Sequence, residues 1–133
     1  MSTDHPNVVL IFADQMRGSA MGCAGNPDVI TPVMDQLAQD GVYFENGIAT
    51  TPVCCPNRGT MLTSTYPICH NVPVNDMPVR TDLPSLGTIA KDNGYDTAYI
   101  GKWHLDGSPR TKFTPPGPRR LGFDDWAVYN CSH

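Results

Sequence analysis

Apolar residues occur in short runs along the chain, and the longest early run is Val8–Ala13. This run is continuous and contains β-branched residues, which is typical of a strand covered on both faces. Later segments of similar character predict three further strands, over Val42–Ala49, Tyr95–Ile100 and Leu121–Tyr129.

Helical patterns separate the predicted strands, over residues 31–41, 57–63 and 86–94. In the first, Thr31-Pro32 combines a capping residue with a proline at the first helical position, and Gly41 ends the helix. The second follows Pro56, which a helix tolerates at its start, and turns Met61 and Leu62 inward.

The third helical pattern places Leu86, Ile89 and Ala90 on one apolar stripe. Strands and helices therefore alternate along the chain. This order predicts an α/β fold, with a mostly parallel sheet and helices on both faces, in a single domain over residues 1–133.

Two polar clusters directly follow predicted strands. Asp14 and Gln15 come after the first strand, and Lys102 and His104 come just after Tyr95–Ile100. In parallel sheets, ligands bind outside the carboxyl ends of the strands. We therefore expect a functional site at this edge of the sheet.

The composition indicates a globular chain with long loops. Proline and glycine number 13 and 12 among 133 residues, well above their usual joint share of roughly 12%. The net charge of −4 argues against general nucleic-acid binding, which usually shows as a basic surface. No stretch approaches the ~20 apolar residues of a membrane helix, so no membrane association is expected.

Two further features concern the compartment. The five cysteines are odd in number and irregularly spaced, which argues against a disulfide scaffold. No cationic segment precedes Val8–Ala13, and the run is too short for a signal peptide. If Met1 is the true start, the expected location is the cytoplasm.

Four of the nine basic residues fall in one proline-rich stretch: Arg110, Lys112, Arg119 and Arg120. A solvated surface loop is the expected reading, with an anion-facing loop as the alternative.

The segment Cys54-Cys55-Pro56-Asn57-Arg58 carries the strongest chemical signal. A cysteine stands just ahead of a helix whose first N–H groups and partial positive charge attract anions. Arg58 can add a bidentate fork for a tetrahedral oxyanion. The pattern predicts a nucleophile beside an anion pocket. Taken alone, it also fits an ordinary buried cysteine beside a surface arginine.

Three segments in this order, Asn7–Arg17, Cys54–Thr63 and Gly101–Leu105, together resemble the N-terminal part of a type I sulfatase of the alkaline phosphatase superfamily. Cys-x-Pro-x-Arg followed by Leu-Thr is the signature of that family, and Gly-Lys-Trp-His is its second motif. The helix that begins at Thr31-Pro32 also resembles the first helix of the family.

The resemblance implies a catalytic set of Cys54, Arg58, Lys102 and His104. Cys54 matches the residue that is converted to formylglycine, whose hydrated aldehyde is the nucleophile. Arg58 matches the residue that holds this group near the metal. Lys102 and His104 match residues that contact the sulfate and the formylglycine hydroxyls.

The resemblance also implies a divalent metal, calcium with magnesium as the alternative. Asp14 and Gln15 match the first pair of metal ligands, with Gln15 in place of the more usual aspartate, and the modified Cys54 completes this part of the site. Oxygen donors suit such a hard cation. The implied partners are a small-molecule or carbohydrate sulfate ester and the enzyme that generates formylglycine.

The chain departs from the family in two ways. Asn57 stands where the family most often has serine or alanine, and family members are several times longer. The second pair of metal ligands, another lysine and another histidine come from later sequence, so the chain is expected to be a sulfatase fragment with half of the metal site. Two alternatives stay open: a phosphonate or phosphate ester hydrolase of the same superfamily, and a non-catalytic fragment.

The motif makes a prediction about maturation. Expressed with a formylglycine-generating enzyme, Cys54 and not Cys55 should lose its sulfur, because only Cys54 has proline and arginine at the spacing of the signature. Mass spectrometry of the tryptic peptide measures this change, with a sulfatase of proven maturation as the control. Unmodified Cys54 in a host that matures the control would contradict the prediction.

Overall fold

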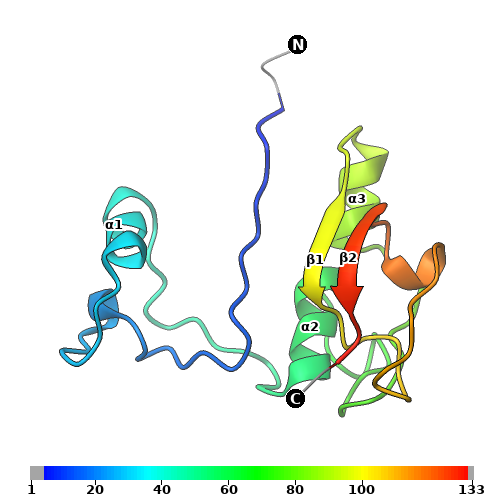
Figure 1. Ribbon diagram of the computed structural model, residues 1–133, viewed down its shortest axis with the longest axis horizontal. Helices are drawn as coiled ribbons and strands as arrows, with labels where there is room; N and C mark the ends of the chain where they lie inside the picture. Colours follow the sequence, from blue (N-terminus) through cyan, green and yellow to red (C-terminus); the bar gives the residue numbers. More distant parts are fainter. Residues whose placement is uncertain (1–4, 132–133) are drawn as a thin grey trace. The chain divides into compact units, whose positions relative to one another are not determined.

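The computed structural model describes residues 5–131 (Figure 1). The chain divides into two compact units, Met1–Gly47 and Ile48–His133. None of the helices among the described residues is long and apolar enough to cross a membrane.

The first unit contains the 3₁₀ helix η1 (Gly22–Ala24) and helix α1 (Pro32–Asp40). The sequence prediction for α1 is confirmed, with Thr31 at the N-cap and Pro32 at the first position. The Thr31 hydroxyl donates to Asp35 Oδ1 at 2.9 Å and accepts from the Gly22 N–H at 2.8 Å. These bonds join η1 to the start of α1.

The prediction of strands over Val8–Ala13 and Val42–Ala49 is wrong for this structure. Neither segment belongs to a strand of the described chain, and their apolar side chains are largely exposed, with Ile11 at 86%. A strand is stabilised by hydrogen bonds to a neighbouring strand. The apolar pattern therefore indicates only a preference for extended structure. Among residues 5–131 no strand pairs with either segment.

The second unit contains helices α2 (Cys54–Thr63) and α3 (Leu86–Asp92), the 3₁₀ helix η2 (Pro118–Arg120), and strands β1 (Ala98–Lys102) and β2 (Asp125–Tyr129). The strands pair in parallel, from Ala98 opposite Asp125 to Lys102 opposite Tyr129 (Figure 1). The predicted third and fourth strands are thus confirmed with shifted bounds, and their parallel pairing agrees with the predicted mostly parallel sheet. The described part of the sheet has two strands.

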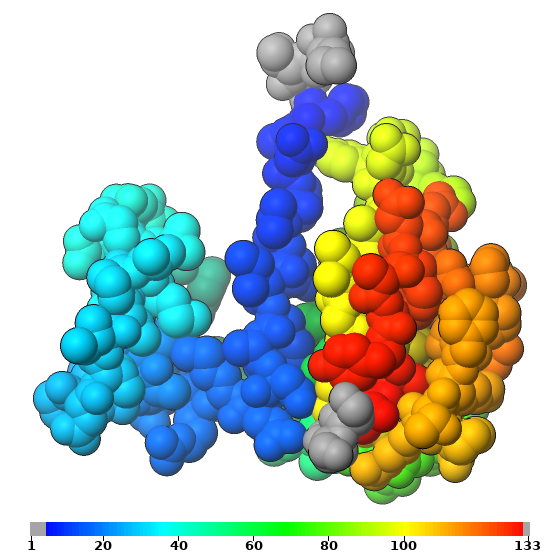
Figure 2. Space-filling model, viewed as in Figure 1, coloured from blue at the N-terminus to red at the C-terminus, as the bar shows by residue number. Residues whose placement is uncertain are grey.

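One face of this sheet is buried and the other is exposed. Tyr99, Trp126 and Val128 alternate toward the hydrophobic core, which includes Leu62 of α2. On the opposite face Ile100 is 82% exposed, and both strands lie at the surface that Figure 2 shows. Helix α2 therefore packs on the buried face of the sheet.

Helix α2 begins at Cys54, three residues earlier than the sequence predicted. Its first backbone hydrogen bond is donated by the Asn57 N–H to the Val53 carbonyl oxygen at 3.0 Å. Pro56 fits in this first turn because its nitrogen has no hydrogen to leave unpaired there. Cys54 is consequently the first residue of the helix and does not precede it.

Helix α3 forms where predicted, but its apolar stripe is not its buried face. Leu86 and Ile89 are 40% and 53% exposed, whereas Gly87 is buried. A Cβ at Gly87 would lie 2.4 Å from the Leu121 carbonyl oxygen. Ser85 caps the helix by a reciprocal pair of bonds with Thr88, and its hydroxyl donates to the same Leu121 oxygen at 2.7 Å.

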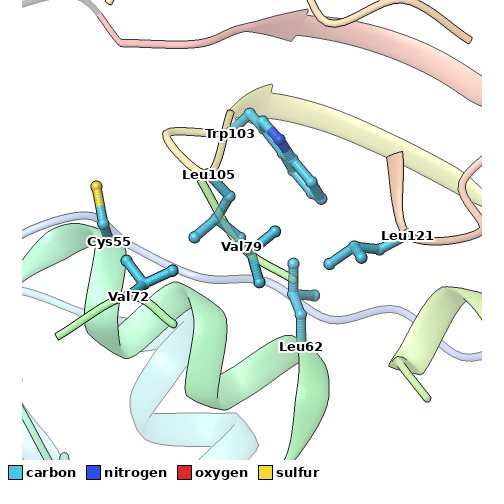
Figure 3. Close-up of a cluster of buried hydrophobic side chains, with 7 residues drawn as sticks. All are labelled: Cys55, Leu62, Val72, Val79, Trp103, Leu105 and Leu121. Carbon is cyan, nitrogen blue, oxygen red and sulfur yellow. The ribbon is translucent and has the colours of Figure 1, made fainter. Parts of the chain in front are cut away.

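The core lies between α2 and the chain that follows β1. Figure 3 shows Leu62 pointing from α2 toward Leu121 and Trp103, all of which are at most 2% exposed. The Trp103 ring makes edge contacts with Tyr99 and Trp126, at centroid distances of 5.0 and 4.9 Å. The inward position of Leu62 predicted from the sequence is confirmed.

The close packing of α2 on His70 makes a prediction about stability. Replacing an exposed glycine in a helix by alanine usually raises the free energy of unfolding by about 1 kcal/mol. At Gly59 the added Cβ would lie 2.5 Å from the buried His70 ring. We therefore expect Gly59→Ala to destabilise the protein by about 1–3 kcal/mol, the usual cost of overpacking.

Urea denaturation measures the free energy of unfolding of this variant. Gly18→Ala is the matched control, since a Cβ there meets no atom within 4 Å. An unchanged or raised stability of Gly59→Ala would show that His70 moves away at little cost.

Candidate functional site

The first turn of α2 and the end of β1 place two predicted site residues together. Cys54 is the first residue of α2 and Lys102 is the last residue of β1. The Lys102 Nζ lies 3.7 Å from the Cys54 Sγ. The lysine is 7% exposed, so its ammonium group is held beside the helix N-terminus and not in open solvent.

Arg58 joins the helix to the strand at this point. Its Nη1 donates to the Lys102 carbonyl oxygen at 2.8 Å, and the Tyr99 hydroxyl donates to the same oxygen at 2.9 Å. Arg58 Nη1 also lies 3.4 Å from that hydroxyl. Because Arg58 is 3% exposed, this charge-assisted bond is buried and fixes α2 against the end of β1.

Trp103 anchors the segment that carries Lys102 and His104. It is fully buried in the core, and its backbone N–H donates to the Tyr129 carbonyl at 2.9 Å. The side chain thus packs into the protein and sets the direction of the residues on either side.

His104 is buried at 1% exposure and adopts a positive φ of 56°. Its Nε2 lies 3.1 Å from the Asp76 Oδ1. Asp76 in turn accepts two hydrogen bonds from the Arg110 guanidinium, both at 2.9 Å. A carboxylate from a distant loop therefore holds the histidine and an arginine together.

The titration of these groups follows from their contacts. Hydrogen bonds from Arg110, and then from His104, lower the pKa of Asp76 to about 2. Burial lowers the pKa of His104, while the hydrogen bond to Asp76 opposes that effect. At neutral pH the carboxylate is charged and the imidazole is neutral.

The Asn75-Asp76 turn also contacts the first turn of α2. The Cys55 N–H donates to Asn75 Oδ1 at 2.9 Å, and the Asp76 N–H donates to the Cys55 Sγ at 3.4 Å. Asn75 thereby satisfies one of the amide groups that a helix start leaves open, since Val53 at the N-cap provides no side-chain cap.

The two adjacent cysteines have different environments. Cys55 is fully buried, and burial raises the pKa of its thiol to about 11, so it is a packed apolar residue. Cys54 is half-buried and lies beside Lys102. All five cysteines are free thiols.

The cations of the basic stretch bind partners within the protein. Arg110, Lys112 and Arg119 are at least partly exposed, as expected for a surface loop, whereas Arg120 is buried. Arg119 Nη1 lies 2.9 Å from Asp106 Oδ1, and Lys112 Nζ donates to the Asp106 carbonyl at 3.0 Å. Arg120 donates to the Thr114 carbonyl and stacks over the Trp126 ring at 4.9 Å. With Arg110 on Asp76, each of the four cations has an internal partner.

Asp14 and Gln15 lie in the first unit, in a turn where Gln15 has a φ of 57°. Their carboxylate and amide oxygens are the donor types that a hard divalent cation prefers, and they would supply two of the six to eight ligands of calcium. Among residues 5–131 there is no cluster of three or more histidine, cysteine or acidic side chains that could hold a metal. The pair fits such a cation as part of a ligand set.

The structure thus brings Cys54, Arg58 and Lys102 together, and it sets His104 two residues beyond Lys102. Sequence analysis missed Asn75, Asp76 and Tyr99. Tyr99 lies within a predicted strand, where nothing marks its hydroxyl as functional. Asn75-Asp76 lies in a loop with three prolines, and adjacent Asn and Asp residues there indicate only a turn.

Comparison with known proteins gives a consistent assignment. The family model described as Sulfatase matches residues 6–131. An ulvan-active sulfatase of Formosa agariphila is 48% identical over 128 residues, which cover 96% of this chain and 25% of that protein. The chain spans about a quarter of the length of the curated relatives it matches.

Solved structures share the fold. A structure from the metabolism of multiple glycosaminoglycans by Bacteroides thetaiotaomicron aligns with a TM-score of 0.88 and 29% identity, over 97% of this chain and 33% of that one. A phosphonate monoester hydrolase of Agrobacterium radiobacter aligns with a TM-score of 0.77 and 33% identity, over 93% of this chain and 26% of that one.

The Asp76–Arg110 pair predicts a dependence of stability on pH. The folded-state pKa of Asp76, about 2, lies below its ordinary value of 3.8. The pair therefore stabilises the fold fully above pH 3.8, and this contribution is lost as the pH falls toward 2. We expect Arg110→Gln to be less stable than the parent protein at pH 6, and the difference to shrink from pH 4 downward.

Urea denaturation at several pH values measures this difference. Arg80→Gln, which breaks an exposed pair with Asp82, is a control for loss of a surface arginine. A difference between Arg110→Gln and the parent that stays constant down to pH 3 would contradict the assigned pKa of Asp76.

Proposed function

The chain belongs to the sulfatase family, and on this premise we propose that it forms the part of a sulfuric ester hydrolase that carries the nucleophile. The observation that carries the proposal is the contact of 3.7 Å between Lys102 Nζ and Cys54 Sγ at the start of α2. It joins the two motifs of the family, Cys-x-Pro-x-Arg and Gly-Lys-Trp-His, in one place.

We propose that Cys54 acts after conversion to formylglycine. One oxygen of its hydrated aldehyde would attack sulfur, and the alcohol would leave with the electron pair of its bond to sulfur. The second hydroxyl would then release sulfate as the aldehyde re-forms. The Cys54 sulfur marks the place of those oxygens at the first position of the helix. Cys55 does not compete for this role, because it is buried against the Asn75-Asp76 turn.

Lys102 and the helix start supply positive charge where negative charge collects. A sulfate ester repels an incoming oxyanion, and a fixed ammonium group beside the helix N-terminus offsets that repulsion. Arg58 holds Lys102 at its backbone, so the cation is positioned before substrate binds. Preorganised charge of this kind needs no rearrangement during the reaction.

His104 is proposed to accept the proton of the second hydroxyl. A buried imidazole that is neutral at pH 7 can take this proton, and its basicity suits the task near neutral pH. Loss of the proton drives formation of the carbonyl, and the sulfate oxygen leaves with the electron pair of its bond to carbon. Water then adds to the aldehyde and restores the hydrate.

A divalent cation, calcium or magnesium, is proposed to bind Asp14 and Gln15 and to supply further charge stabilisation for the sulfate oxygens. The oxygen donors of this pair fit a hard cation.

The proposed substrate is a sulfated carbohydrate. The relative from Formosa agariphila is named for its activity on ulvan, and the Bacteroides structure for glycosaminoglycan metabolism. A phosphonate ester is the second candidate, supported by the phosphonate monoester hydrolase among the structural neighbours. Turnover of an aryl sulfate against an aryl phosphonate by the full-length protein distinguishes the two.

The proposed roles predict distinct losses of activity in the full-length, matured protein. Cys54→Ala should abolish turnover, because no other residue provides a hydrated aldehyde, and Arg58→Ala should be nearly as severe. Lys102→Ala should lose about 10²–10³ in kcat, as expected for one preorganised charge. Cys55→Ala is the matched control and should keep its activity if it folds.

His104→Ala should differ in kind. Transfer of sulfate to the enzyme would survive while regeneration of the aldehyde slows, so a burst of alcohol release would precede near-arrest. Rapid-quench kinetics can resolve this behaviour. Unchanged steady-state turnover without a burst would rule out the proton-accepting role of His104.

A further inference from the structure

One aspartate outside both family motifs contacts a residue in each motif, Cys55 in the first and His104 in the second. Asp76 donates its backbone N–H to Cys55, the neighbour of Cys54, and accepts from His104 and Arg110 through its side chain. It thereby links the first turn of α2 to the segment after β1.

The local backbone indicates that this arrangement is held in place. Asp76 and His104 both adopt positive φ angles, 66° and 56°. Such angles are uncommon for residues other than glycine. Strained residues of this kind gather at functional sites because the surrounding structure holds them there.

The hydrogen bond fixes which nitrogen of His104 carries the proton. The charged Asp76 carboxylate can only accept hydrogen bonds, so the Nε2 that lies 3.1 Å from it must be the donor. In a neutral imidazole, Nδ1 then holds the lone pair. The charges of Lys102 and Arg110 also act on the ring, and a negative carboxylate favours an N–H pointing toward it, whereas these cations do not.

We propose that Asp76 is a positioning residue, which holds the Nε2–H of His104 and so leaves Nδ1 as the nitrogen that accepts the proton. This inference rests on the proposed role of His104 in ester hydrolysis. Arg110 donates to both oxygens of the carboxylate, including the Oδ1 that lies against His104, and so fixes its orientation. The Asp76–Cys55 bond sets the distance of this pair from the helix start.

The first test is the tautomer of His104 in the full-length protein. Long-range ¹H–¹⁵N spectra of protein labelled with ¹⁵N-histidine distinguish the two neutral forms, and His104→Gln assigns the signal. The expected form carries hydrogen on Nε2. A His104 with hydrogen on Nδ1 would overturn the inference, whether or not the protein hydrolyses sulfate esters.

The second test compares four variants in the matured protein. Asp76→Ala should lower kcat about 10- to 100-fold, the usual effect of removing a group that orients a functional histidine. KM should stay within about twofold, because substrate binding is not the step affected. The same variant should show a mixture of His104 tautomers.

Three variants separate positioning from mere structural support. Asp76→Asn keeps an oxygen toward Nε2–H and should retain the tautomer and most of kcat. Arg110→Gln breaks the ion pair but leaves the bond to His104, so its kcat should exceed that of Asp76→Ala severalfold. Asp82→Ala, which removes an exposed carboxylate paired with Arg80, should leave kcat unchanged.

The tautomer and kcat must change together. If Asp76→Ala fails to fold, Asp76→Asn still tests this link, because a lost Nε2–H signal with unchanged kcat would refute it. An equal loss of kcat in Arg110→Gln and Asp76→Ala would show that Asp76 has only a structural role. An inactive parent protein with the expected tautomer would instead refute the proposed function and leave the positioning geometry standing.

Discussion

The buried bond between the Arg58 guanidinium and the Lys102 carbonyl is the contact on which the site depends. It spans 44 residues of sequence and joins a helix start to a strand end. A buried guanidinium must be satisfied by hydrogen bonds, since an unpaired charge there is costly. Because Arg58 needs this hydrogen-bond partner, the backbone of Lys102 is held in one position. The distance from the Lys102 side chain to Cys54 is fixed as a result.

The aromatic core provides the rigidity behind this contact. Tyr99, Trp103 and Trp126 pack edge to face, and the Tyr99 hydroxyl supports the same Lys102 carbonyl from the strand side. One ring thus serves both the core and the site. The Gly-Lys-Trp-His motif can be understood in these terms: the tryptophan is inserted into the core, and the lysine and histidine beside it are held by that insertion.

The Asn75-Asp76 turn adds a second link between the same two elements. It contacts Cys55 on the helix and His104 after the strand. The start of the helix is therefore held by this turn as well as by the bond from Arg58 to Lys102. The cysteine pair shows the consequence: Cys55 faces the turn and is packed, while Cys54 lies beside Lys102. Two adjacent residues of the same type therefore have separate roles, one in packing and one in the proposed chemistry.

The sequence by itself predicted the helices, a mostly parallel sheet that includes the last two strands, and the residues Cys54, Arg58, Lys102 and His104. These predictions rest on local signals: caps, prolines, periodicity, and motifs whose members lie within a few residues of each other. Membership of the sulfatase family followed from the same motifs.

Only the tertiary structure decided which residues meet across long separations. Asp76 comes 28 residues before His104 and 34 before Arg110, and no local pattern links them. The predicted strand at Val8–Ala13 failed for a related reason, because strand formation requires hydrogen bonds from a neighbour that the segment's own residues cannot specify. Local preference is encoded along the chain, whereas partners for backbone and buried polar groups are set by the fold.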